Sequence, residues 1–264
     1  MKKIFILTVL AVVFVVSGVN AQGAAQSLDA QVIVEKSRDR ILAETVSTRY
    51  RMVITARNGA VSERVMDQYS KDDSSGNSRM VIVFQSPVSV SGTRFLTIEN
   101  QDRANDQWIF LPSLNRVRRI AASEGSGSFV GTDFSYDDLS STSRSTDLDN
   151  HRLLGEEKLN DLDCYMIEST PKEDVYQYSR MIQWIDKEDF NIHKVELYDG
   201  RGTLVKLLEI LDYREVQGRL SPHVTKMTTL AAGTSTALHV EILNYDSNIP
   251  ESVFTTNYLE TGRP

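Results

Sequence analysis

The stretch Trp108–Leu139, WIFLPSLNRVRRIAASEGSGSFVGTDFSYDDL, joins four kinds of local sequence. An aromatic run, Trp108–Leu111, precedes a basic run, Arg116–Ile120, and each has the length and composition of a strand. A Gly/Ser-rich loop follows, and then a segment, Phe129–Leu139, that combines aromatic and acidic residues. The stretch contains no pairing of a nucleophile with a general base. It therefore points away from catalysis.

Short strand-like runs separated by turn residues continue on both sides of this stretch. Tyr50, Met52 and Ile54 alternate on one face of a predicted strand, and Asn58-Gly59 predicts the hairpin turn after it. Their even spacing predicts a mainly β fold, an antiparallel meander curled into a barrel or part-barrel. The further predicted strands are 61–69, 79–84, 92–99, 107–111, 116–120, 152–158, 164–169, 180–186, 192–198, 204–213, 224–230 and 238–245.

An amphipathic helix is predicted to precede these strands over Leu28–Thr45, with Ser27 or Asp29 as its cap. Several later strands are apolar on both faces, as in the run from Met80 to Phe84. A strand with one wet face should alternate between apolar and polar residues. Two interpretations remain open: a helix covers one face and a neighbouring sheet the other, or one face lines a cavity for an apolar ligand.

Residues 1–21 are predicted to be a cleaved signal peptide. Lys2 and Lys3 precede an apolar run, and Val19-Asn20-Ala21 has the small residues of a cleavage site. Residues 22–264 then form a single domain in the periplasm. Loss of the two lysines changes the net charge from −7 to −9, and an acidic protein is a poor binder of nucleic acid. Cys164 is the only cysteine, so the chain has no internal disulfide.

The patterns of catalytic and metal sites are not matched. The four histidines are far apart and show no ligand spacing. The glycines of the loop at 125, 127 and 131 lack the Lys-Ser/Thr of a phosphate-binding loop. Asp133, Asp137 and Asp138 lack calcium-loop spacing, and Asp137 and Asp138 are interpreted as a solvated helix start. We therefore expect no catalytic residue, no metal and no cofactor.

Two groups within the first stretch have open interpretations. Arg116 and Arg118 share one strand face and Arg119 the other; they are either salt-bridged surface residues or contacts for an anionic head group or an acidic partner. Phe129, Phe134 and other large residues after the Gly/Ser loop are either core anchors or part of a lid over the cavity.

The same stretch resembles the outer membrane lipoprotein-sorting family, the LolA-like periplasmic carriers. The resemblance is carried by the following residues: Trp108, Phe110, Leu111, Pro112, Arg116, Val117, Arg118, Arg119, Phe129, Gly131, Asp133, Phe134, Ser135, Tyr136, Asp138 and Leu139. It implies an incomplete, strongly curved antiparallel β-barrel with short helices covering the opening. The concave side would hold the acyl chains of a lipoprotein or lipid.

The resemblance also implies partners. The cargo would leave an inner-membrane transporter, of the RND or the ABC type, and pass to an outer-membrane acceptor, and the carrier could work as a monomer. The alternative is a non-enzymatic accessory protein of an RND-type exporter that binds protein and not lipid. For the carrier we predict a lipid site of apolar strand and loop residues, namely Met52, Ile54, Ile82, Phe84, Trp108, Phe110, Phe129, Phe134 and Tyr136.

Overall fold

The computed structural model describes residues 29–264, apart from 42, 74–76, 101–102, 141–144 and 174–175. The predicted signal peptide, 1–21, and the candidate cap Ser27 lie outside the described residues. Within the described part, no helix combines the length and the apolar character needed to cross a bilayer.

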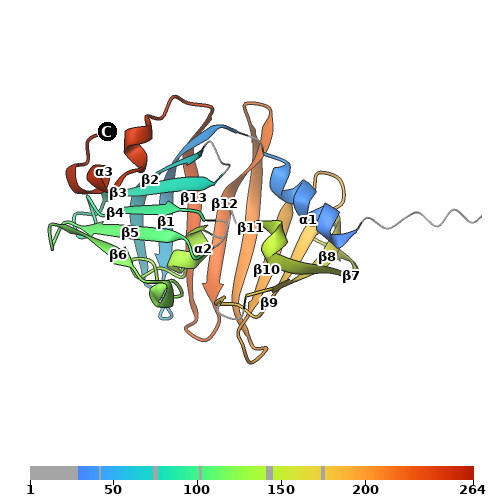
Figure 1. Ribbon diagram of the computed structural model, residues 1–264. Coiled ribbons are helices and arrows are strands. Elements are labelled where there is room, and N and C mark those ends of the chain that lie inside the picture. Colours follow the sequence, from blue (N-terminus) through green and yellow to red (C-terminus); the bar gives the residue numbers. More distant parts are fainter. Residues whose placement is uncertain (1–28, 42, 74–76, 101–102, 141–144, 174–175) are drawn as a thin grey trace, which may run out of the picture.

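One antiparallel sheet of 13 strands forms the body of the molecule, in the order β6-β5-β4-β3-β2-β1-β13-β12-β11-β10-β9-β8-β7 (Figure 1). Two meanders, β1–β6 and β7–β13, meet where β1 pairs with β13. The described strands β6 and β7 are the two edges, so the sheet is not closed into a barrel. The strands are β1 Thr45–Thr55, β2 Val61–Asp72, β3 Ser78–Ser86, β4 Arg94–Ile98, β5 Asp106–Leu111, β6 Arg116–Ile120, β7 Asp149–Leu159, β8 Leu162–Pro171, β9 Arg180–Asp186, β10 Ile192–Tyr198, β11 Leu204–Val216, β12 Arg219–Thr229 and β13 Thr234–Tyr245.

The sheet is strongly curved, so that β3–β6 run nearly across the direction of β11–β13 (Figure 1). Irregular pairing contributes to this bend, because a β-bulge increases the local twist of a strand. The register shifts at Arg49/Tyr50 between β1 and β13, and at Val65/Met66 between β2 and β3. The incomplete, curved antiparallel barrel expected from the sequence is therefore confirmed.

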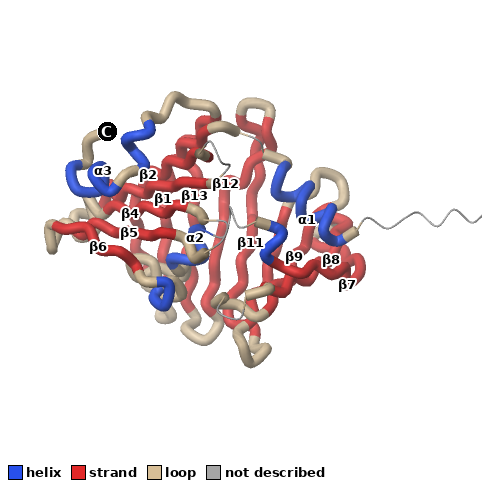
Figure 2. Tube along the Cα trace, in the orientation of Figure 1, coloured by secondary structure: helices blue, strands red, loops and turns tan. Residues whose placement is uncertain are grey.

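Short helices lie against this sheet (Figure 2). Asp29 caps α1, Ala30–Asp39, as predicted, but the helix ends before the predicted Thr45. Thr45 instead begins β1, where it pairs with Lys71, so strand pairing shortens the helix. The other helices are η1 Ala122–Glu124, α2 Tyr136–Ser140, η3 Thr146–Leu148, η4 Glu251–Phe254 and α3 Thr256–Thr261.

The two faces of the sheet bury different clusters. On the concave face, Met52, Met66 and Ile82 belong to a large buried cluster that includes residues of the loop between β6 and β7. On the convex face, Val81 and Leu96 pack against η4 and α3. The apolar residues on both faces of β3 are thus covered from both sides. The cover is a loop on the concave side and a helix on the convex side.

Candidate functional site

A segment that we call the plug, residues 128–139, fills the concave side of the sheet. Its residue Phe129 is completely buried. The ring centroid of Phe129 lies 5.7 Å from that of Phe84, 5.3 Å from that of Phe95 and 5.6 Å from that of Tyr136. Phe134 is buried in the same cluster. The aromatic side chains of the plug therefore cover the apolar wall of the concave face.

The plug is shaped by a tight internal turn. The amide of Phe129 donates to the carbonyl of Phe134 at 2.8 Å, and the hydroxyl of Thr132 donates to the carbonyl of Phe129 at 2.8 Å. At the tip, Val130 and Gly131 both have positive φ, 49° and 74°. This conformation is costly for a β-branched residue and easy for glycine. The turn projects Phe129 and Phe134 together towards the sheet.

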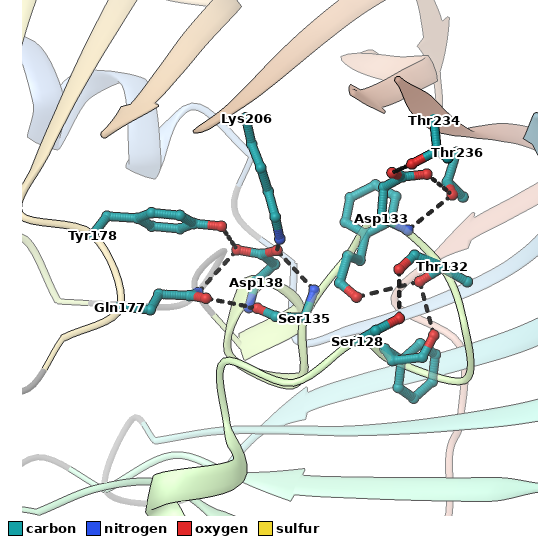
Figure 3. Close-up of polar contacts among 12 residues, drawn as sticks. Ser128, Thr132, Asp133, Ser135, Asp138, Gln177, Tyr178, Lys206, Thr234 and Thr236 are labelled. Carbon is teal, nitrogen blue, oxygen red and sulfur yellow. Dashed lines mark hydrogen bonds and ion pairs between the residues drawn. The ribbon is translucent and has the colours of Figure 1, made fainter. Parts of the chain in front are cut away.

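Asp138 anchors one end of the plug (Figure 3). Its carboxylate accepts hydrogen bonds from Tyr178 Oη at 2.8 Å and from Gln177 Nε2 at 2.9 Å. It also accepts from Lys206 Nζ at 2.8 Å, and from the amide of Ser135 within the plug at 2.7 Å. Burial, followed by the charge of Asp138, raises the pKa of Tyr178, so this phenol stays protonated as a donor.

Asp133, near the middle of the plug, anchors it to β13. Its carboxylate accepts from the hydroxyls of Thr234 and Thr236, and its amide donates to Thr236 Oγ1 at 3.0 Å (Figure 3). At the tip of the plug turn, which precedes Asp133, Arg64 Nη1 of β2 donates to the carbonyl of Val130 at 2.6 Å. Burial lowers the pKa of Arg64. The plug is thus held by polar contacts from strands β2, β11 and β13 and from the β8–β9 connection.

The placement of Asp138 corrects the sequence interpretation. α2 does begin at Tyr136, but Asp138 is only 8% exposed and is not solvated. The acidic pair Asp137-Asp138 resembles an ordinary helix start in sequence, because its buried partners are 39 to 68 residues away. A distant lysine and tyrosine decide that one carboxylate of the pair is internal.

Most of the predicted lipid-site residues lie together. Four strand residues and three plug residues share the concave cluster: Met52, Ile54, Ile82, Phe84, Phe129, Phe134 and Tyr136. Phe129 and Phe134 are buried core residues, as in the first of the two interpretations left open above, and their role as a lid stays a prediction. Their binding of lipid stays a prediction.

The placement of Trp108 and Phe110 on that wall is wrong. Both lie on the convex face, in the cluster with η4 and α3, whereas Ile109 between them faces the concave side. Arg94 packs over the ring of Phe110 and donates to the carbonyl of Leu259 in α3 at 2.7 Å. Alternate residues of a strand point to opposite faces of the sheet. When both faces are apolar, this alternation does not indicate which set of residues faces the concave side.

The arginines of β6 are partly neutralised by nearby carboxylates. Arg118 Nη1 contacts Glu124 at 2.7 Å, and Arg119 pairs with Asp106, while Arg116 is exposed. Arg118 pairs with Ile109 of β5 and Arg119 pairs with Trp108. Because Trp108 and Ile109 point to opposite faces of the sheet, the two arginines do so too, as predicted. These ion pairs support the salt-bridged interpretation for Arg118 and Arg119. A head-group or partner contact by the cluster remains a prediction.

Asp106 gives a pH-dependent contribution to stability. A hydrogen bond from Arg103, followed by those from Asn100 and Arg119, outweighs burial and lowers the pKa of Asp106 from 3.8 to about 2. The carboxylate therefore stabilises the fold above about pH 4, and this contribution is lost as the pH falls towards 2. We expect Asp106→Asn to lower the thermal midpoint at pH 7 by about 2–4 °C.

Thermal melts followed by circular dichroism at several pH values check this expectation. The midpoints of the wild type and Asp106→Asn should converge as the pH approaches 2. A difference that stays constant from pH 7 downwards would contradict the role of the ionised carboxylate.

Several residues of the site give no local signal in the sequence. Arg64 and Lys206 are isolated from other cations by at least six residues within their strands, and Gln177 and Tyr178 lie in the β8–β9 connection. The one local indication is that Lys206 alternates with apolar residues of β11, so it shares a face with Leu204 and Leu208. Within the described part of the chain, no group of three or more His, Cys, Asp or Glu residues is placed to hold a metal.

Comparisons with known proteins agree with this architecture. A family model described as "Uncharacterized protein" matches residues 76–261. A solved domain from Vibrio parahaemolyticus, assigned as an outer membrane lipoprotein-sorting protein, is similar with 29% identity and a TM-score of 0.82, over 88% of this chain and 98% of that one. No curated protein matches the chain.

Two further solved structures are similar. A DUF1329 family protein from Desulfovibrio piger has 27% identity and a TM-score of 0.82, over 87% of this chain and 97% of that one. A LolA superfamily protein from Nitrosomonas europaea has 22% identity and a TM-score of 0.70, over 88% of this chain and 100% of that one, which shows a shared fold.

Proposed function

Because this chain belongs to the LolA-like family of outer membrane lipoprotein-sorting proteins, we propose that it is a periplasmic carrier of acyl chains. It takes a lipoprotein or lipid from an inner-membrane transporter and passes it towards the outer membrane. The carrier is not an enzyme, and it works as a monomer that presents the same opening to successive partners.

One observation carries the proposal: the apolar wall of the curved sheet is covered by a loop and not by a second sheet. Phe129 and Phe134, which cover this wall, belong to a single segment with polar anchors. A single segment can be displaced without unpairing any strand of the sheet. Acyl chains can then take the place of the plug's rings on Ile82 and Phe84.

The energies of such an exchange suit a carrier. Each methylene moved from water to an apolar wall stabilises the complex by about 0.8 kcal/mol. Against this stands the loss of the plug's own contacts, including the hydrogen bonds of Asp133 and Asp138. Because ligand and plug compete for one wall, binding is tight but not irreversible, and an acceptor with a better-matched cavity can remove the cargo.

Native mass spectrometry of the gently purified mature chain tests the proposal. We expect it to retain lipid, or to take up one added acyl ligand per chain, because the wall can accept hydrocarbon in place of the plug. Hydrogen exchange should then become faster at residues 128–139 and stay unchanged in β7 and β8, which lie away from the plug.

The same measurement separates the alternatives. A chain that takes up no acyl ligand and captures the periplasmic domain of an RND-type exporter would support the accessory-protein alternative. Ligand uptake with unchanged protection of the plug would show that the ligand binds elsewhere and would contradict the exchange of plug for acyl chains.

A further inference from the structure

Lys206 and Arg64 are cations that face inwards among the apolar residues of the concave wall. Lys206 of β11 lies on the same face as Leu208, two residues away, and its side chain is 16% exposed. Arg64 of β2 pairs directly with Met52 of β1, a residue of the buried cluster, and its guanidinium lies over the ring of Phe84. A wall built only for hydrocarbon has no use for either charge.

In the closed structure these cations are compensated by the plug. Lys206 Nζ lies 2.8 Å from Asp138 Oδ2, and Arg64 Nη1 lies 2.6 Å from the carbonyl oxygen of Val130. Within the described residues, no ion pair joins Arg64 to a carboxylate. Withdrawal of the plug therefore removes the compensating oxygen from both cations at once.

A neutral ligand would leave this charge in an apolar site. Removing one partner of a buried ion pair is strongly destabilising, because the remaining charge is neither solvated nor paired. A ligand that carries its own anion avoids this cost. The cations thus favour an anionic cargo over a neutral one. Acyl chains by themselves do not distinguish these two classes.

The donors around Asp138 already form an oxyanion site. Lys206 Nζ, Tyr178 Oη and Gln177 Nε2 converge on its two carboxylate oxygens at 2.8–2.9 Å (Figure 3). All three donors lie outside the plug and remain when it leaves. A carboxylate or phosphate oxygen accepts such charge-assisted hydrogen bonds equally well.

We propose that the cargo is an anionic amphiphile whose phosphate or carboxylate replaces the carboxylate of Asp138 at Lys206, Tyr178 and Gln177. Its acyl chains replace Phe129 and Phe134. The plug then acts as an internal mimic of the cargo, with an anion and apolar rings in one segment. This inference rests on the proposed carrier function and specifies its substrate class.

The test compares two short-chain lipids of equal chain length, phosphatidylglycerol and diacylglycerol, which lacks the phosphate, below the concentrations at which they aggregate. Affinities are measured by calorimetry for the wild-type mature chain and for Lys206→Met, Lys206→Arg and Lys158→Met. Lys158 is an exposed residue of β7 and is the matched control. The readout is the ratio of the two affinities, because a changed plug equilibrium scales both by the same factor.

We expect the wild type to prefer phosphatidylglycerol at least tenfold. Lys206→Met should abolish the preference, whereas Lys206→Arg and Lys158→Met should keep it. Equal affinities in the wild type, or an unchanged ratio in Lys206→Met, would overturn this inference while leaving the carrier function intact.

Two further results are decisive. Inorganic phosphate alone should not compete at millimolar concentration, since the acyl chains supply most of the binding; effective competition would mean a site for free phosphate and would overturn an amphiphile as cargo. Failure to bind either lipid would overturn the carrier function together with this inference.

Discussion

Replacing Phe129 by alanine should tighten acyl binding at least about tenfold, while lowering the stability of the empty protein. Phe129 is completely buried against three other aromatic rings, and such a truncation costs about 3–5 kcal/mol. This loss falls on the closed state, in which the plug occupies the wall. Only open molecules bind the ligand, so the apparent affinity rises when a weaker plug increases the open fraction. About 1.4 kcal/mol lost from the closed state raises the apparent affinity tenfold.

Titration with a fluorescent fatty acid, together with thermal melts, measures both effects. Phe110→Ala is the matched control, because Phe110 is a buried phenylalanine of the convex cluster. The control should lose stability to a similar extent and bind the ligand as the wild type does. If Phe129→Ala binds more weakly, Phe129 contacts the ligand and does not compete with it.

A polar residue in the wall should have the opposite effect. We expect Leu208→Gln to weaken acyl binding by about a hundredfold, because the amide loses the apolar contact of leucine and stays unpaired beside hydrocarbon. Leu208 is a half-buried residue that packs on the concave cluster, so its amide can reach water when no ligand is bound. The empty protein should therefore stay folded.

The neighbouring residue supplies the control for this substitution. Leu207 is also half-buried, but it pairs with Glu196 and lies on the opposite face of β11. Leu207→Gln should leave the affinity within about twofold of the wild type in the same titration. Equal losses in both variants would mean that the concave wall is not the binding surface.

Local periodicity explains why the strands were predictable and the faces were not. Alternation in β1 places Met52 and Ile54 on one face, and the structure confirms both in the concave cluster. In β5 every residue from Trp108 to Leu111 is apolar, so the sequence carries no contrast between its faces. The position of α3, far along the chain, decides that Trp108 and Phe110 face outwards.

The sequence by itself determined the positions of the strands along the chain, the turns between them and the resemblance to lipoprotein-sorting proteins. These features depend on residues close together in the chain, where period two and turn chemistry act. Only the tertiary structure decided that the loop after β6 folds into the concave side and that Asp138 meets Tyr178 and Lys206 there. Those contacts join residues 40 and 68 positions apart, and their energy exists only once the curved sheet has brought the residues together.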